Sequence, residues 1–160
     1  MKKIVLRLVA ISASEKVIDE QRIRNYSLFE RYIEALGLNG IEQLYPFMIW
    51  GVTFWGKSIN GSQDMVALEE EIHKILFPYI PYQYKNFCNL YNLPYPNENI
   101  DKKWLNSRCD SIVLWSHIYY EGDIFVTRDK NFHKQIKKER LIGLGARMIV
   151  TPKEALDLLE

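Results

Sequence analysis

Apolar and polar positions first alternate along this chain and then recur at helical spacing. A period of two residues is typical of a β-strand and predicts one over residues 2–11. The alternating apolar series there is Ile4, Leu6, Leu8 and Ala10. Residues 15–36 have apolar positions at roughly helical spacing and predict a helix that ends at Gly37. Ser12 and Glu15 have the spacing of a capping box at the start of that helix.

The middle of the chain is less regular and rich in aromatic residues. Residues 41–62 combine aromatic side chains with glycines, which predicts packed but partly irregular structure. Residues 65–77 carry an apolar stripe and predict an amphipathic helix, and the acidic run 69–71 is expected on its solvated face. Residues 78–100 contain four of the six prolines and predict a loop with at most short helical turns.

The last third of the chain alternates between helical and strand patterns. The predicted elements are a helix over 107–120, a strand over 124–126, a basic helix over 132–141, a strand over 146–150 and a last helix. Thr151, Pro152 and Glu154 have the residue types of a cap, a first helical position and a capping-box partner for that last helix.

Helices that alternate with strands indicate right-handed parallel crossovers. We therefore expect an α/β fold, a three-layer α/β/α sandwich with a mainly parallel sheet. A chain of 160 residues predicts a single domain over 1–160. The aromatic and proline-rich segment around 41–104 is interpreted as an insertion into that domain.

Composition narrows the class of protein rather than its chemistry. The net charge of +1 gives the whole chain no strong attraction to nucleic acid or membrane, so such a partner requires a local patch. The longest apolar runs fall short of the roughly 20 residues of a membrane helix, and the N-terminal stretch does not have the form of a secretory signal. Cys88 and Cys109 are interpreted as buried thiols, and we expect a cytoplasmic protein without a membrane partner.

Two acidic residues of the last third are expected to meet at one edge of the sheet. Asp129 follows the strand at 124–126, and Asp110 is expected to begin the preceding helix. A chain that leaves an edge through a helix and returns along a strand brings two such residues together. Neighbouring carboxylates repel each other unless a cation lies between them. Mg²⁺ or Mn²⁺ prefers a ligand set of this kind, made of oxygen atoms.

These residues resemble the C-terminal half of the PIN domain family. The matching stretch is CDSIVLWSHIYYEGDIFVTRDKNFHKQIKKERLIGLGARMIVTPKEAL, residues 109–156. The family has an Asp at a helix start, then a strand and a T-x-D-x-x-F turn, which Asp110, Thr127, Asp129 and Phe132 match. The resemblance implies a metal-dependent nuclease, RNA rather than DNA as substrate, and an antitoxin or a second copy of the chain as a possible partner.

The N-terminal part departs from the family pattern and leaves two alignments open. A PIN domain begins with a strand that ends in Asp, whereas the strand over 2–11 is followed by Ser12. In the first alignment this is the family's first strand, and the lost acid weakens or abolishes metal binding. In the second, which is preferred, it is a later strand, and Glu15 is the family's Glu. The strand with the first Asp is then absent from this chain.

A basic stretch follows Asp129 and contributes the expected contacts to a phosphate backbone. Lys130, Lys134 and Lys137 are the candidate nucleic-acid-binding residues. Thr127 is expected to orient Asp129 or a bound water through its hydroxyl.

The resulting hypothesis is a PIN-like nuclease, with Asp110, Asp129 and Glu15 as the catalytic and metal-holding residues. The alternative is a PIN-like module without catalysis that binds nucleic acid or protein, which the missing acid favours. A zinc site is not expected, because the three histidines are far apart in sequence.

Overall fold

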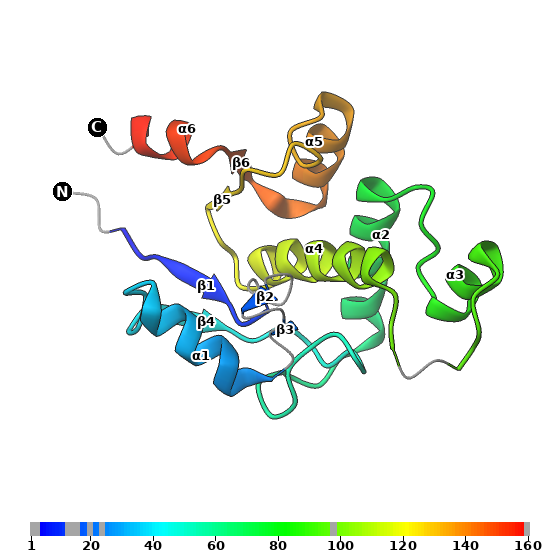
Figure 1. The fold of residues 1–160 in the computed structure, drawn as a ribbon. Helices are drawn as coiled ribbons and strands as arrows, with labels where there is room; N and C mark the ends of the chain where they lie inside the picture. The colour runs from blue at the N-terminus through cyan, green and yellow to red at the C-terminus, as the bar shows by residue number, and fades with distance from the viewer. Residues whose placement is uncertain (1–3, 12–16, 19–20, 23–24, 97–98, 159–160) are drawn as a thin grey trace.

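The computed structural model describes residues 4–11, 17–18, 21–22, 25–96 and 99–158. Helices dominate these residues, and the strands are short (Figure 1). In chain order the elements are β1 (Arg7–Val9), β2 (Val17–Ile18), β3 (Gln21–Arg22), α1 (Tyr26–Ala35), β4 (Glu42–Leu44), α2 (Gln63–Leu76), α3 (Tyr84–Tyr91), α4 (Lys102–Tyr119), β5 (Ile124–Val126), α5 (Gln135–Leu141), the π-helical turn η1 (Ile142–Ala146), β6 (Met148–Val150) and α6 (Pro152–Asp157).

The strands form three separate pairs within the described residues. β1 pairs in parallel with β4, and β5 pairs in parallel with β6, with Phe125 opposite Ile149. β2 and β3 form a small antiparallel pair. The chain is therefore a mixed α/β structure with short parallel strands, as the sequence predicts. A single sheet inside a three-layer sandwich stays a prediction.

The helix predicted over residues 15–36 is wrong in its first half. Residues 17–18 and 21–22 are the strands β2 and β3, and α1 begins only at Tyr26. Its N-cap is Asn25, whose side-chain oxygen accepts the N–H of Leu28 at 3.0 Å. The β-branched pair Val17 and Ile18 suits an extended strand, and the Asn cap satisfies a backbone donor that a longer helix would have bonded internally. The predicted capping box of Ser12 and Glu15 lies outside the described residues.

The other helices differ from their predictions mainly at the ends. Ser62 caps α2, so this helix begins at Gln63. The segment predicted as a loop over 78–100 contains the two-turn helix α3. The start of α6 is confirmed: Thr151 caps it, Pro152 begins it, and the Glu154 carboxylate accepts the N–H of Thr151 at 2.6 Å.

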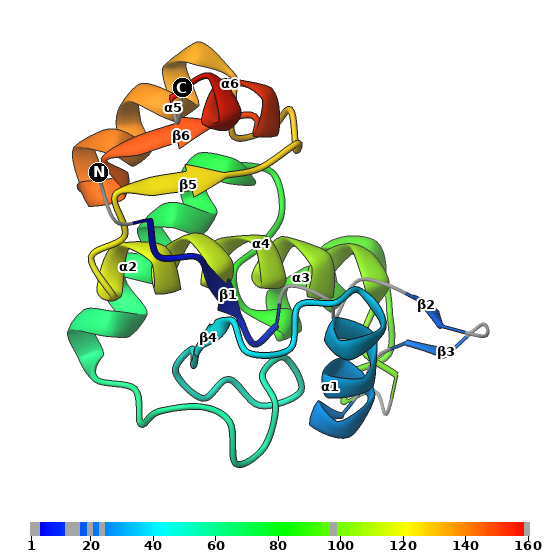
Figure 2. The same cartoon turned by 90° about the vertical axis from the view of Figure 1, so that its left-hand side faces the viewer.

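Helix α4 is the centre of the core. It lies in the middle of the fold, with α2 packed across it and β5 and β6 above it (Figures 1 and 2). Buried residues occur on all its sides, as expected of a central helix. Trp115 is fully buried and makes an edge contact with Phe47, at 4.8 Å between ring centroids. The segment 41–104 therefore packs into the same core as the last third of the chain.

The aromatic residues and cysteines follow the predicted burial only in part. Cys88, Cys109, Trp104 and Trp115 are buried, whereas Trp50 and Trp55 lie on the surface. Large apolar side chains on loops are often exposed, because a small protein has too little polar surface to cover itself.

A buried ion pair joins α2 to α4. The Glu69 carboxylate accepts from the Arg108 guanidinium at 2.8 Å and from the Tyr82 hydroxyl at 2.7 Å. The prediction that the run 69–71 is solvated is therefore wrong for Glu69, which is fully buried. The prediction considered only the charge of Glu69. Its position on α2 directs the side chain toward α4, where the Arg108 guanidinium compensates that charge.

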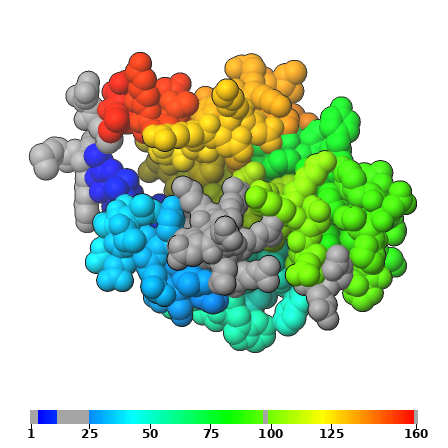
Figure 3. Space-filling model, in the orientation of Figure 1, coloured from blue at the N-terminus to red at the C-terminus, as the bar shows by residue number. Residues whose placement is uncertain are grey.

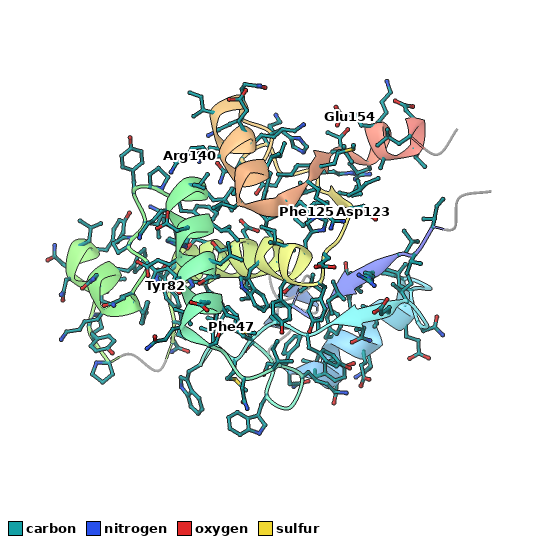
Figure 4. All side chains as sticks on the ribbon, turned by 180° about the vertical axis from the view of Figure 1, so that it is seen from behind. Phe47, Tyr82, Asp123, Phe125, Arg140 and Glu154 are labelled. Carbon is teal, nitrogen blue, oxygen red and sulfur yellow. The ribbon has the colours of Figure 1, made fainter. Side chains whose placement is uncertain are left out.

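The same cluster holds the backbone turn that follows α2. Arg108 stacks on the Tyr82 ring, with 3.8 Å between the guanidinium carbon and the ring centroid, and donates to the Tyr82 carbonyl at 3.1 Å. Trp104 Nε1 donates to the carbonyls of Pro81 and Tyr82. His73 Nε2 donates to the Ile80 carbonyl at 2.9 Å. Side chains from α2 and α4 thus fix the course of residues 80–82. Figure 4 shows Tyr82 beside these helices.

We predict that breaking the ion pair is costly and that replacing both partners is not. Arg108→Met leaves the Glu69 charge buried and unpaired, so the free energy of unfolding should fall by about 3–5 kcal/mol in urea titrations. The double variant Arg108→Met with Glu69→Leu should recover much of this loss, because no charge remains buried. An Arg108→Met variant as stable as the wild type would contradict this account. Glu70→Gln, on the exposed side of α2, is the matched control.

We also predict opposite pH dependences from two neighbouring buried groups. Burial raises the pKa of Glu69 from 4.5 to about 7, against the opposing effects of Arg108 and Tyr82. Burial lowers the pKa of His73 from 6.5 to about 4. The folded state holds more protons at Glu69 and fewer at His73 than the unfolded state. Glu69 therefore lowers stability as the pH rises from 4.5 to 7, and His73 raises stability as the pH rises from 4 to 6.5.

Replacing either residue should reveal how the other one changes the free energy of unfolding with pH. In Glu69→Gln, the free energy of unfolding should rise with pH between 4 and 6.5, by at most about 1.4 kcal/mol per pH unit and histidine. His117 contributes with the same sign, because burial also lowers its pKa. In His73→Gln, stability should fall between pH 4.5 and 7 more steeply than in the wild type. Urea titrations across this range measure both slopes, and equal slopes in all three proteins would contradict the assignment.

Candidate nucleic-acid-binding groove

A groove of about 1110 Å³ lies between the end of α2 and the helix α5. One wall consists of the last turn of α2 and the turn through residues 77–80. The other consists of Lys134, which is the N-cap of α5, and of residues 135–137 and 140 within that helix. Tyr91 and Lys103, from α3 and α4, also line it. In the space-filling view, α5 and the end of α2 lie next to each other at the top of the molecule (Figure 3).

Hydrogen bonds tie the two walls together. The Leu76 carbonyl at the end of α2 accepts from the Asn131 side chain at 3.0 Å and from the Lys137 ammonium. The same ammonium donates to the Asn131 side-chain oxygen at 2.6 Å. Since this carbonyl belongs to a helix end and has no partner within its own helix, the cross-wall bonds satisfy it. The separation of the walls is therefore fixed by these bonds.

The lining of the groove is strongly basic. It contains Lys74, Lys103, Lys134, Lys137 and Arg140, and Asp129 is its only acidic residue. A cleft lined by one sign of charge raises the local concentration of ions of the opposite sign. The groove therefore suits an anionic ligand.

The five cations are not equally available to a ligand. Lys74 pairs with Glu70 and Glu71 on its own helix. Lys103 donates to the Tyr91 hydroxyl at 2.8 Å. Burial lowers the pKa of Lys137, whose ammonium is occupied by the cross-wall bonds. Lys134 and Arg140 are exposed on α5, and Figure 4 shows Arg140 on the side of this helix toward α2. These last two can meet an anion directly.

Asp129 lies in a tight turn at the edge of this groove. Its N–H donates to Thr127 Oγ1 at 3.1 Å, and its Oδ1 accepts the N–H of Asn131 at 2.8 Å. His133 Nε2 donates to the Thr127 carbonyl at 2.9 Å and closes the turn. Thr127 thus holds the backbone of Asp129, while the exposed carboxylate remains accessible to a ligand.

Asp110 does not begin a helix as predicted. It lies in the middle of α4, which starts eight residues earlier at Lys102. Asp101 is the N-cap, and its side chain accepts the N–H groups of Lys103 and Trp104. The cap residue decides where a helix starts, and Asp101, which the sequence pattern did not single out, fills that position. Asp110 is half-buried and lies seven residues, or about two turns, after Lys103 on the same side of the helix.

The remaining predicted site residues are spread out. Lys134 and Lys137 line the groove, whereas Lys130 is exposed outside its lining. Glu15 lies outside the described residues. Across residues 4–11, 17–18, 21–22, 25–96 and 99–158, the structure brings together no three His, Cys, Asp or Glu side chains that could hold a metal ion. The histidines are each bonded to a backbone carbonyl instead.

Sequence reasoning missed the part of the groove that comes from α2, α3 and the turn between them. Lys74, Tyr79, Tyr91 and Lys103 are separated by 5 to 12 residues in the printed sequence, and no short motif joins them. The signal that existed was Pro78, which marks the end of α2 and thus the position of the following turn.

Comparisons with known proteins gave no match for this chain. No family model matches the chain, and neither a curated protein nor a solved structure matches it. Among the described helices, none has the length and apolar character needed to cross a membrane.

We predict that Lys137 stabilises the groove rather than binding a ligand. Lys137→Met removes the ammonium that joins Leu76 to Asn131, so the free energy of unfolding should fall by about 1–3 kcal/mol in urea titrations. Lys130→Met, an exposed lysine outside the groove, is the control and should change stability by less than about 0.5 kcal/mol. Equal stability of both variants would contradict the structural role of Lys137.

Proposed function

We propose that this chain is a PIN-like domain that binds RNA in the groove and hydrolyses its phosphodiester bonds beside Asp129. The observation that carries the proposal is the groove itself, in which five cations and a single carboxylate line one cavity. A nucleic-acid backbone requires cations along its path, and hydrolysis at a metal requires a carboxylate within reach of a phosphate. RNA rather than DNA follows from the resemblance to PIN nucleases.

The packing of β5 on α4 supports a meeting of Asp110 with Asp129. His117 of α4 contacts Phe125 of β5, with 5.4 Å between ring centroids. From this contact the chain runs four residues to Asp129, at most about 13 Å. Asp110 lies seven residues before His117, about 10 Å back along the helix. β5 runs back above α4 (Figure 2), so both carboxylates are carried toward the same part of the molecule.

Three acidic residues are proposed to hold Mg²⁺ or Mn²⁺. Asp129 offers an exposed carboxylate, Asp110 approaches from α4, and Glu15 completes the set in the preferred alignment. An ion bound there would supply an activated water and neutralise charge on the phosphate. Thr127 keeps Asp129 in position through the bond to its N–H. Lys134 and Arg140 position the backbone of the substrate.

A second candidate function is nucleic-acid binding without cleavage. It is favoured by the departure from the family pattern at the end of the N-terminal strand, where Ser12 follows in place of the family's Asp. The basic groove serves this function equally well, since phosphate contacts need no metal. An antitoxin or a second copy of the chain as partner, the three-layer sandwich and the cytoplasmic location belong to the same PIN-like proposal.

Metal binding separates the two candidates. We expect Mn²⁺ to bind the wild type in calorimetry, and the double variant Asp110→Asn with Asp129→Asn to lose this binding. RNA cleavage should then require the metal and fall at least a hundredfold in the double variant. Asp123→Asn, an acidic residue paired with Arg147 on the surface, is the control. A wild type that binds RNA but neither Mn²⁺ nor Mg²⁺ would contradict the nuclease and support nucleic-acid binding without cleavage.

The basic groove predicts a specific change in salt dependence. Lys134→Gln with Arg140→Gln should weaken RNA binding and reduce the slope of log K against log salt by about 0.7 for each cation removed. Fluorescence anisotropy of a labelled oligonucleotide at several salt concentrations, with EDTA present, measures this slope. Lys130→Gln with Lys153→Gln removes the same charge outside the groove and should leave the slope nearly unchanged. The same loss in both double variants would show that net charge acts, and not the groove.

A further inference from the structure

Tyr79 is an exposed aromatic residue in the lining of the groove. Its side chain is 88% exposed, and it lines the groove with Pro78 and Ile80. Burying a tyrosine ring is favourable, so a ring left this far in solvent gains little for the fold. Among the described residues, no ring stacks on Tyr79 and no side-chain hydrogen bond holds its hydroxyl.

The backbone that presents Tyr79 is fixed on both sides. Before it, the Phe77 N–H donates to the His73 carbonyl at 2.7 Å. After it, the Ile80 N–H donates to the Phe77 carbonyl at 3.0 Å, and the Ile80 carbonyl accepts from His73 Nε2 at 2.9 Å. Pro78 fixes one further backbone angle. Tyr79 therefore lies on a rigid turn, and the protein backbone loses little entropy there when a ligand covers the ring.

The opposite wall carries a second exposed apolar side chain among cations. Ile136 on α5 is 75% exposed and lines the same groove. Lys134, the N-cap of α5, precedes Ile136 by two residues, and Arg140 follows it by four on the same helix. Since the bonds to the Leu76 carbonyl fix the walls, the apolar groups of both walls and the cations of α5 form one preformed surface.

We propose that Tyr79 stacks on one unpaired base of the bound strand, with Ile136 covering the base from the other wall and Lys134 and Arg140 taking the flanking phosphates. This inference rests on the proposed function and adds a base-stacking residue to it, so the strand must be single at this point. A flat ring surrounded by cations suits a ligand that is both aromatic and anionic, which a nucleotide is. Stacking of this kind tolerates every base, because each base has a π-face.

The test compares bases with abasic sites at constant backbone charge. The probes are a labelled octanucleotide of single-stranded RNA and an abasic oligonucleotide of equal length, titrated with EDTA present so that no cleavage occurs. Tyr79→Ala should weaken binding of the base-containing strand by about 5- to 150-fold and leave binding of the abasic strand unchanged. Tyr79→Trp should retain wild-type binding. The salt slope should be the same for all three proteins, because the ring carries no charge.

Controls and contrary outcomes separate this inference from the function on which it rests. Tyr95→Ala removes a half-exposed tyrosine outside the groove lining and should have no effect. Thermal unfolding checks that Tyr79→Ala remains folded. If this variant binds both strands as the wild type does, or weakens both equally, the stacking role is wrong while the groove remains a nucleic-acid site. If the wild type binds neither strand at low salt, the proposed function fails and the stacking role fails with it.

Discussion

The ion pair between Glu69 and Arg108 is the interaction on which the arrangement of this protein depends. It joins the two longest helices in the core, away from water that would otherwise solvate both charges. Only one carboxylate oxygen is satisfied, since Glu69 Oε1 has no hydrogen-bond partner among the described residues. Such a pair adds little net stability, but the loss of either partner leaves the other buried without compensation.

The consequences of this pair extend to the groove. Arg108 also binds the carbonyl and ring of Tyr82, so the turn after α2 is held to α4 by the same side chain. That turn forms one wall, and the Leu76 carbonyl just before it receives the bonds that fix the other wall. A neutral or repacked α2–α4 contact would leave the wall without this support. Core electrostatics and surface function are thus connected through one short stretch of backbone.

The cations of the groove have different roles, which the overall composition of the chain does not show. With a net charge of +1, the chain as a whole attracts no polyanion strongly. Lys137 uses its charge inside the structure, whereas Lys134 and Arg140 remain at the surface. Asp129 introduces the only negative charge among them. The groove thus combines two exposed cations with one exposed carboxylate.

Local rules were sufficient for several short elements in the last third of the chain. The apolar run at 124–126 forms the predicted strand, and it pairs with β6. The capping box of Thr151 and Glu154 also forms as the sequence predicts, because its two bonds join residues three positions apart. The turn at Asp129 is local for the same reason. The pattern from 15 to 36 failed because its spacing resembled a helix, while the cap at Asn25 and strand pairing decided otherwise.

Only the tertiary structure decided the burial of Glu69, the place of Asp110 and most of the groove. The sequence pattern indicates that Glu69 is exposed, because its partner Arg108 lies thirty-nine residues away on another helix. Asp110 lies in the middle of α4 and not at its start, because the helix begins at Lys102 after the cap Asp101. Tyr79 and Lys103 share a cavity because α2 and α4 cross, and no spacing along the chain encodes that crossing. The sequence determined which short segments are helix or strand, and the packing of distant helices determined where the chemistry is.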